Sequence, residues 1–267
     1  MSSLIKAYIS RAALRHNFRI VLAKSRGARV CAVVKANAYG HGAPLVIRAL
    51  AGLEVACWAV ATLNEAQELQ QAGIRKPILI FRPLEAYAPA KTLRAQLDLI
   101  LAAGWRATVT SQAGLDMLAA AARRRRRKAL YHLKIDTGMG RNGCGIDEAQ
   151  ELIQRSQKTP GLKLEGLYSH FAWADAPDLT HARQQWVTFK SLLDNLGRTN
   201  GRPICHMANS AAIFNLPAAR LDMVRTGRAL YGFGSQLFRG ADGLRPALRL
   251  EAPLVAAKWL RRGQGCG

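Results

Sequence analysis

The chain has 267 residues, of which 49% are hydrophobic, so it is long enough to bury one large core. Its 39 basic and 17 acidic residues give a formal net charge of +22, which attracts phosphates, nucleic acid and anionic membrane surfaces. No apolar run approaches the roughly 20 residues of a membrane helix, and the N-terminus has no apolar secretory core. The five cysteines are scattered and indicate neither a zinc site nor a disulfide framework, which favours a reducing cytoplasm.

In chain order, Met1–Arg15 reads as a strand followed by a helix that Ser10 caps. Short apolar segments then alternate with helical patterns. Eight strands that each lead into a helix or loop predict a parallel sheet closed as a (β/α)8 barrel, with an open doubly wound sheet as the alternative. The strand candidates are Arg29–Lys35, Val55–Ala61, Pro77–Phe81, Ala107–Thr110, Leu130–Asp136, Leu164–His170, Ile204–Met207 and Met223–Arg225. The helical patterns include Ala43–Leu50, Leu63–Ala72, Ser111–Ala122, Asp147–Gln157 and His181–Gly197.

The densest run of positive charge is Arg123–Lys128, which lies between an alanine-rich helical segment and a strand candidate. We expect a solvated helix end or loop there. No aromatic residues interleave with the run, so a stacking platform for single-stranded nucleic acid is not indicated.

Polar side chains fall at the carboxyl ends of the strand candidates. In a barrel those ends meet at one face, where the active sites of this fold lie. The residues that end or follow the strands are Lys35, Lys134, Asp136, Ser169, His170, Asn209, Ser210, Arg225 and Gly227. Their distribution predicts a catalytic face.

The character of the chain changes after Gly232. Residues 232–246 are irregular and rich in glycine, whereas Leu248–Leu260 alternates and is β-prone, with Pro253 breaking it. We interpret residues 11–235 as the barrel and residues 236–267 as a linker and the start of a second, β-rich domain. Residues 1–10 are expected to contribute a strand associated with that domain.

The most informative segment is the run Val-Val-Lys-Ala-Asn-Ala-Tyr-Gly-His-Gly over residues 33–42. Desolvation lowers the pKa of an amine at the end of an apolar strand, so Lys35 can act as a nucleophile or base near neutral pH. A lysine that simply leaves a strand into solvent is the common alternative. The whole run resembles the pyridoxal-phosphate lysine motif of the alanine racemase family. The resemblance implies that Lys35 forms a Schiff base with the cofactor and that Tyr39 contacts the cofactor phosphate.

A second run, His-Leu-Lys-Ile-Asp-Thr-Gly-Met-Gly-Arg-Asn-Gly over residues 132–143, contains a formal Gly-x-Gly-x-x-Gly after a strand. Glu165 lies about twenty residues further on, as in a dinucleotide-binding loop, but such a strand is normally apolar to its end. The run resembles instead the family's Lys-x-Asp-Thr-Gly-Met-x-Arg-x-Gly. This implies that Arg141 contacts the cofactor phenolate oxygen and the substrate carboxylate. It also implies that Lys134 is carbamylated by carbon dioxide, as in some members, with an ordinary amine as the alternative.

The remaining matches lie at the later strand ends. A lone histidine is usually a satisfied core residue, but His170 lies in Ser-His-Phe-Ala-Trp-Ala-Asp. This run is similar to the family's Ser-His-Phe-Ala-x-Ala-Asp, whose histidine joins an active-site hydrogen-bond network. Loops after the seventh and eighth strands of a barrel suit a phosphate group. The resemblance assigns the cofactor phosphate to these loops, at Asn209, Ser210, Gly227 and Arg228, and only the backbone amide of Arg228 is expected to matter.

Arg225 resembles the arginine that faces the pyridine nitrogen of the cofactor in this family. A guanidinium holds its proton and cannot protonate that nitrogen, so the ring is a weaker electron sink. A weaker sink favours returning a proton to Cα over transamination, as a racemase requires. Related barrel decarboxylases are expected to place an acid there.

The resemblance implies interconversion of L- and D-alanine, a cytoplasmic reaction that supplies bacterial wall synthesis, and a head-to-tail homodimer. Lys35 would serve one face of Cα, and a tyrosine from the β-domain of the second subunit would serve the other. Gly265-Cys266-Gly267 aligns just before that tyrosine, so we expect this chain by itself to bind the cofactor, racemise alanine poorly and dimerise weakly. Metal and membrane partners are not expected.

Two other functions fit parts of the sequence. A single-barrel carrier of pyridoxal phosphate would need no second domain, although the run from Lys134 to Arg141 argues for substrate binding. A nucleic-acid-binding module would follow from the net charge of +22, although the motifs at the strand ends already have a chemical explanation.

Overall fold

The computed structural model describes residues 5–87, 90–196, 202–234 and 236–265. Eight strands form its main sheet: β2 Arg29–Val33, β3 Val55–Val60, β4 Ile78–Pro83, β5 Arg106–Val109, β6 Ala129–Lys134, β7 Leu162–Tyr168, β8 Ile204–His206 and β9 Met223–Thr226. All eight overlap the strands expected from the sequence. Strands β2, β6 and β7 each end two residues earlier than expected, because the polar residues that follow them leave the sheet. These residues lie in the loops at the carboxyl ends of the strands.

The eight strands run parallel in the order β8-β7-β6-β5-β4-β3-β2-β9. The two outermost strands of this order meet. The backbone N–H of Asp222 donates to the carbonyl of Cys205 at 3.0 Å, and that of Arg225 donates to the carbonyl of Ala208 at 2.9 Å. The sheet therefore closes on itself, which confirms the (β/α)8 barrel and excludes the open doubly wound sheet.

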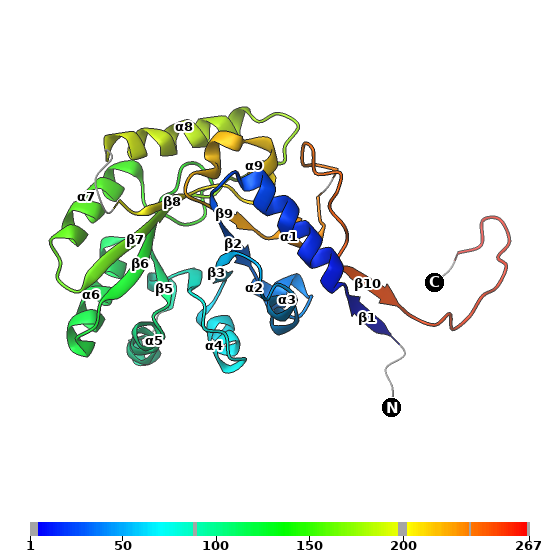
Figure 1. Cartoon of the computed structure of the whole chain (residues 1–267), viewed down its shortest axis with the longest axis horizontal. Coiled ribbons are helices and arrows are strands. Elements are labelled where there is room, and N and C mark those ends of the chain that lie inside the picture. The colour runs from blue at the N-terminus through cyan, green and yellow to red at the C-terminus, as the bar shows by residue number, and fades with distance from the viewer. Residues whose placement is uncertain (1–4, 88–89, 197–201, 235, 266–267) are drawn as a thin grey trace.

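Helices surround the barrel (Figure 1). The α-helices are α1 Arg11–Ser25, α2 Lys35–Tyr39, α3 Ala43–Ala49, α4 Leu63–Gln71, α5 Ala90–Ala103, α6 Gln112–Arg125, α7 Ile146–Gln157, α8 Thr180–Asn195 and α9 Ser210–Asn215. The described residues also form the short 3-10 helices η1 Leu84–Tyr87, η2 Pro217–Arg220 and η3 Arg228–Tyr231. Side-chain caps start several helices: Ser10 caps α1, as expected, and Thr62 and Ser111 cap α4 and α6. Helix α6 ends in the exposed run 123–128.

Alternation along the strands creates two apolar layers. One layer lies between the strands and the helices and includes Phe18, Trp105 and Phe189, all buried. The other is a small cluster on the opposite face of the strands that contains Cys31 and Met223. Cys31 is the register partner of Arg225, so the inner face of the barrel carries polar groups as well as apolar ones. The inner face can therefore present charged side chains to a site.

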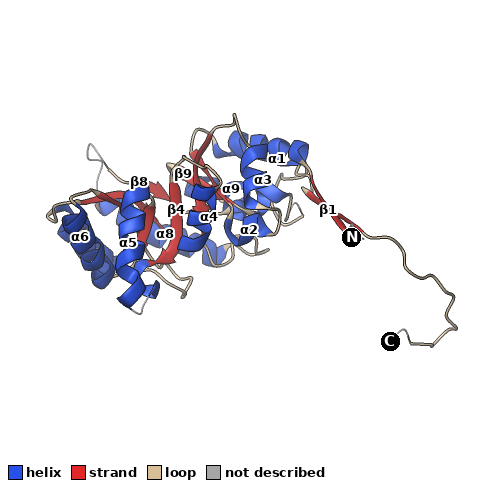
Figure 2. Ribbon diagram, turned by 90° about the horizontal axis from the view of Figure 1, so that it is seen from below, coloured by secondary structure: helices blue, strands red, loops and turns tan. Residues whose placement is uncertain are grey.

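Two strands from near the two ends of the chain lie outside the barrel (Figures 1 and 2). Strand β1, Lys6–Ile9, pairs antiparallel with β10, Leu248–Glu251. The alternating segment expected to reach Leu260 is strand only as far as Glu251, and residues 252–260 extend away from the barrel without regular structure. Cys266 and Gly267 lie outside the described residues. Within the described ranges, the helices are all too short or too polar to cross a membrane.

Candidate active site

A cavity of about 470 Å³ opens at the carboxyl ends of the barrel strands. Its lining includes every residue that the sequence predicted for the site: Lys35, Tyr39, Lys134, Arg141, His170, Asn209, Ser210, Arg225, Gly227 and Arg228. Two other polar residues from the strand ends do not line it. The carboxylate of Asp136 faces backbone N–H groups of its own loop, and the hydroxyl of Ser169 shares a 2.8 Å hydrogen bond with Thr137.

Lys35 precedes a left-handed turn. Residues 36–39 have φ between 51° and 56°, and none of them is a glycine. Such a conformation costs roughly 1–2 kcal/mol per residue, so the surroundings must hold it. The N–H of Ala38 donates to the carbonyl of Val34 at 2.8 Å, and the side-chain oxygen of Asn37 accepts from the N–H of Ala43 at 2.8 Å. The turn is therefore tied at both ends.

The amine of Lys35 is half-buried at the cavity. Burial lowers its pKa, the positive charge of Arg141 lowers that pKa further, and the carboxylate of Glu65 opposes the shift. The Nζ atom lies 5.7 Å from the centre of the Tyr39 ring, within the range of a cation–π contact. A lysine with a lowered pKa holds more of the neutral, nucleophilic amine near pH 7.

The loops after β8 and β9 converge on Ser210. The hydroxyl of Ser210 accepts from the backbone N–H groups of Gly227 at 3.0 Å and Ala229 at 3.2 Å. Asn209 caps α9, because its side-chain oxygen accepts from the N–H of Ala212 at 3.0 Å. The oxygen of Ser210 therefore holds these two N–H groups, and its own hydroxyl proton remains to be donated at this end of the cavity, as an anionic group would require.

Tyr39 and Arg228 flank these donors. A Cβ atom at Gly227 would lie 2.7 Å from the Tyr39 hydroxyl oxygen, so the absence of a side chain lets the phenol reach the loop. The guanidinium of Arg228 forms a 2.6 Å ion pair with Asp175 at the cavity wall. The side chain of Arg228 therefore takes part in the site, in addition to the backbone amide expected from the sequence.

The glycine-rich run after β6 folds back over the cavity. One carboxylate oxygen of Asp136 accepts from the N–H groups of Gly138, Met139 and Gly140 at 2.8–3.2 Å. A Cβ at Gly143 would lie 2.6 Å from the backbone nitrogen of Asp136. The glycines thus serve a tight loop that brings Arg141 to the cavity.

Lys134 is almost fully buried beneath this loop. Its ammonium group donates to the backbone carbonyl of Asn142 at 2.6 Å and to the side-chain oxygen of the same residue. Burial, together with the positive charge of Arg141, lowers the pKa of Lys134 to about 8. About a tenth of the amine is therefore unprotonated at pH 7.

Arg225 is buried under the cavity. Its Nη2 atom donates to the carbonyls of Ser169 at 2.7 Å and Met207 at 3.1 Å, and to Nδ1 of His170 at 3.1 Å. Its Nη1 atom donates to Nδ1 of His206 at 2.7 Å. Because a guanidinium only donates, both histidines accept through Nδ1, and a neutral ring then carries its proton on Nε2.

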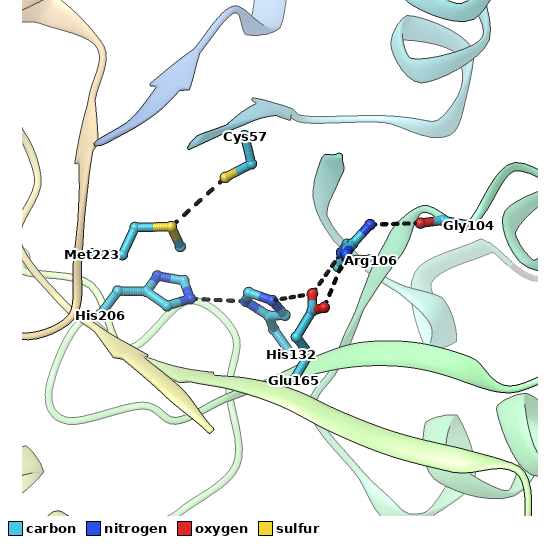
Figure 3. Close-up of polar contacts among 7 residues, drawn as sticks. All are labelled: Cys57, Gly104, Arg106, His132, Glu165, His206 and Met223. Carbon is cyan, nitrogen blue, oxygen red and sulfur yellow. Dashed lines mark hydrogen bonds and ion pairs between the residues drawn. The ribbon is translucent and has the colours of Figure 1, made fainter. Parts of the chain in front are cut away.

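A chain of polar groups continues from His206 toward the other end of the barrel (Figure 3). Nε2 of His206 lies 2.8 Å from Nδ1 of His132, and Nε2 of His132 lies 3.6 Å from the carboxylate of Glu165. Arg106 pairs with the same carboxylate at 2.5 Å and 2.9 Å. Each group in this chain therefore donates a hydrogen toward the next one: Arg225 to His206, His206 to His132, and His132 toward the carboxylate of Glu165.

Burial keeps these imidazoles neutral. It lowers the pKa of His170, His206 and His132, and the charge of Arg225 lowers them further. Glu165 has a pKa of about 2, because hydrogen bonds from His132 and Arg106 outweigh the effect of burial. Glu165 lies away from the glycine-rich loop, which argues against the dinucleotide interpretation of that run.

Sequence reasoning missed several residues of the site. Tyr168 lines the cavity and stacks on His206 with the ring centres 4.8 Å apart. Glu65 accepts a hydrogen bond from the backbone beside Lys35. Its position three residues after Thr62 is the sequence signature of a capping box, and this signature could have identified Glu65 as a residue that binds backbone. His132 and His206 carried no comparable signal, because they come from strands far apart in the sequence.

Fold and site together define a (β/α)8-barrel protein with a cationic cavity for a small anionic ligand. Six lining residues of the described chain are lysine or arginine, and one, Asp175, is acidic. Residues 9–235 match the family model described as alanine racemase, N-terminal domain. The chain therefore belongs to the alanine racemase family, which confirms the resemblance seen in its sequence.

Individual relatives agree with this assignment. An alanine racemase of Sorangium cellulosum is 37% identical over 267 residues, which cover 98% of this chain and 69% of that protein. One from Treponema pallidum is 37% identical over 91% of this chain and 63% of its own length. The crystal structure of alanine racemase from Streptomyces lavendulae has a TM-score of 0.83 and 35% identity, covering 94% of this chain and 66% of that one. The chain thus spans about two thirds of the length of these relatives.

Proposed function

We propose that this chain binds pyridoxal 5'-phosphate through Lys35 and serves the interconversion of L- and D-alanine. The observation that carries the proposal is the placement of a half-buried amine with a lowered pKa in the same cavity as the donors around Ser210. Membership of the alanine racemase family supports the same reaction.

The residues present fit this cofactor. Its aldehyde requires an amine, which Lys35 offers, and its phosphate requires donors, which the hydroxyls of Tyr39 and Ser210 offer. The N–H of Gly227, which donates to Ser210 in this structure, lies beside them and would turn to the phosphate. The excess of cations in the cavity also suits a phosphate and an amino-acid carboxylate. We assign Asn209 and Arg228 to the support of the same phosphate loop.

When bound, pyridoxal phosphate supplies an electron sink for negative charge at the substrate Cα. Lys35, with its lowered pKa, removes or returns the Cα proton on one face. Arg141 orients the substrate carboxylate from the opposite loop. Arg225 keeps its own proton, and His170 accepts a hydrogen bond from it. Neither residue would therefore protonate the ring nitrogen of the cofactor.

We also propose that Lys134 is carbamylated. Its neutral amine would attack the carbon of carbon dioxide, so that a C–N bond forms as one C=O π bond opens, and the nitrogen would release a proton. The anionic carbamate would then pair with the positive charge of Arg141. The pKa of about 8 supports this step, because only the neutral amine reacts. Protein exposed to ¹³C-labelled carbon dioxide should show one carbamate resonance that a Lys134→Arg variant lacks.

Residues 11–235 form the proposed cofactor-binding domain, and residues 1–10 and 236–267 are assigned to a second unit because β1 pairs with β10 outside the barrel. For this chain by itself we propose weak dimerisation. Leu254, Val255 and Trp259 are almost fully exposed, as interface side chains are before assembly. Sedimentation of the chain at several concentrations tests this proposal, and a tight dimer would contradict it.

The proposed function is tested by adding pyridoxal phosphate to the purified chain. We expect a visible absorption band that borohydride bleaches, with a covalent adduct on Lys35 in the digested protein. A colourless protein, or an equally coloured Lys35→Ala variant, would contradict the proposal. Formation of D-alanine from L-alanine then tests the reaction itself, and we expect it to be slow with this chain alone, as stated from the sequence.

A further inference from the structure

Glu65 forms more hydrogen bonds than the start of a helix requires. In a capping box, the glutamate at the third helical position accepts from the backbone of the cap residue. The Oε2 atom of Glu65 does so, accepting from Thr62 N–H at 3.0 Å, and it also accepts from the N–H of Ala61 at 2.6 Å. Its Oε1 atom is left for another partner and accepts from the N–H of Ala36 at 2.7 Å.

That third hydrogen bond joins two separate parts of the barrel rim. Ala36 follows Lys35 directly and is the first residue of the left-handed turn. Ala61 follows β3, the strand next to β2 in the barrel. One carboxylate therefore links the backbone after the lysine to the end of the neighbouring strand, at a residue whose conformation is costly by itself.

We propose that Glu65 is a positioning residue that holds the left-handed turn after Lys35 and thereby fixes the Lys35 amine at the cavity. This inference deepens the proposed function, because it identifies a residue on which the cofactor-binding lysine depends. Glu65 acts through the backbone of Ala36 and through its charge, and it does not line the cavity.

Glutamine is the informative replacement at this position. A carboxylate accepts at both oxygens, whereas an amide accepts at one oxygen and turns an NH2 group toward another donor. Glu65→Gln therefore keeps the size of the side chain but loses the hydrogen bonds made by one of the two carboxylate oxygens. An amide oxygen that keeps the two bonds to Ala61 and Thr62 turns its NH2 group toward the N–H of Ala36. Glu65→Asp keeps the charge but is one methylene shorter, so it cannot span both partners.

The experiment measures two quantities on protein without added cofactor: amide hydrogen exchange at Ala36 and the titration of the Lys35 amine by NMR. In Glu65→Gln we expect exchange at Ala36 to rise about tenfold, for the loss of one charged hydrogen bond. The pKa of Lys35 should move further down, because the negative charge of Glu65 raises it. Affinity for pyridoxal phosphate should fall about tenfold.

Thr62→Ala is the matched control. It removes the hydroxyl that accepts from Glu65 N–H at 3.3 Å and weakens the same helix start, but leaves the carboxylate on Ala36. We expect Ala36 exchange and Lys35 titration near the wild-type values in this variant. Glu65→Asp should raise exchange at Ala36 even though its charge is retained.

Unchanged Ala36 exchange and Lys35 titration in Glu65→Gln would overturn the proposal. Equal changes in Thr62→Ala would overturn it as well, because they would show that Glu65 acts only by starting α4. If the wild-type chain does not bind pyridoxal phosphate, the proposed function falls, while the two cofactor-free measurements still decide the role of Glu65.

Discussion

Replacing Gly227 with alanine tests the close approach on which the phosphate end of the cavity depends. A Cβ there would lie 2.7 Å from the Tyr39 hydroxyl oxygen and 3.2 Å from the adjoining ring carbon. Contacts this short force the tyrosine to move, because the backbone of the loop is held by Ser210. Overpacking of this kind costs about 1–3 kcal/mol. Because the phenol is displaced from the site, affinity for pyridoxal phosphate should fall about ten- to a hundredfold.

The assay is a titration with pyridoxal phosphate followed by absorbance, together with urea unfolding. Gly145→Ala is the matched control, since Gly145 has φ −68° and a Cβ there would meet no atom within 4 Å. Its cost in stability should stay below about 1 kcal/mol. Tyr39→Phe removes the nearest oxygen, so Gly227→Ala should cost less in that background. Equal costs in both backgrounds, or unchanged affinity of Gly227→Ala, would refute the reasoning.

Three further predictions follow from named contacts. Asn37→Ala removes the acceptor for Ala43 N–H inside the left-handed turn and should lower the free energy of unfolding by about 1–2 kcal/mol in urea titrations; an unchanged midpoint would contradict this. In buffer free of carbon dioxide Lys134 stays an amine, with a folded pKa of about 8, below the 10.5 of a free lysine. The unfolded chain then binds more protons between these values, so the free energy of unfolding should rise with pH across that window, by about 3 kcal/mol relative to Lys134→Met. Glu165 has a folded pKa of about 2, below the usual 4.5, so its stabilisation of the fold is present above pH 4.5 and is lost as pH falls toward 2. In unfolding experiments over that range, the stability of Glu165→Gln should fall less with acid than that of the wild type. Parallel curves for the two proteins would contradict this prediction.

Local patterns in the sequence are enough to place the barrel strands. Each strand is an apolar, β-branched run that ends where polar residues begin, and that rule located all eight. The same rule set the strand ends too late, at Lys35, Asp136 and His170. Apolar periodicity cannot tell a polar residue at the end of a strand from one that has already turned into a loop, because this depends on which neighbour accepts its backbone hydrogen bonds.

The candidate site was readable because its chemistry is carried by short runs. Lys35, Tyr39, Arg141 and Arg225 each sit in a segment whose residue types suffice to suggest a role. The polar chain below Arg225 was not readable: His132 and His206 lie 74 residues apart, and neither has a local signal. The pairing of β6 and β8 with the two sides of β7 brings a nitrogen of one ring within 2.8 Å of a nitrogen of the other.

The sequence by itself determined the alternation of strands and helices and the rim that carries the reactive side chains, because both follow from residue type and spacing. The family was indicated by the resemblance of whole motifs. Tertiary structure alone decided how Lys35 is held. In Ala-Asn-Ala-Tyr only the asparagine tolerates a left-handed conformation well, and four such residues in a row need outside support. A carboxylate 29 residues away, on the helix that follows the next strand, supplies the hydrogen bond at the start of the turn. Backbone conformations that are unfavourable locally exist where distant groups stabilise them, and the local sequence does not reveal which groups these are.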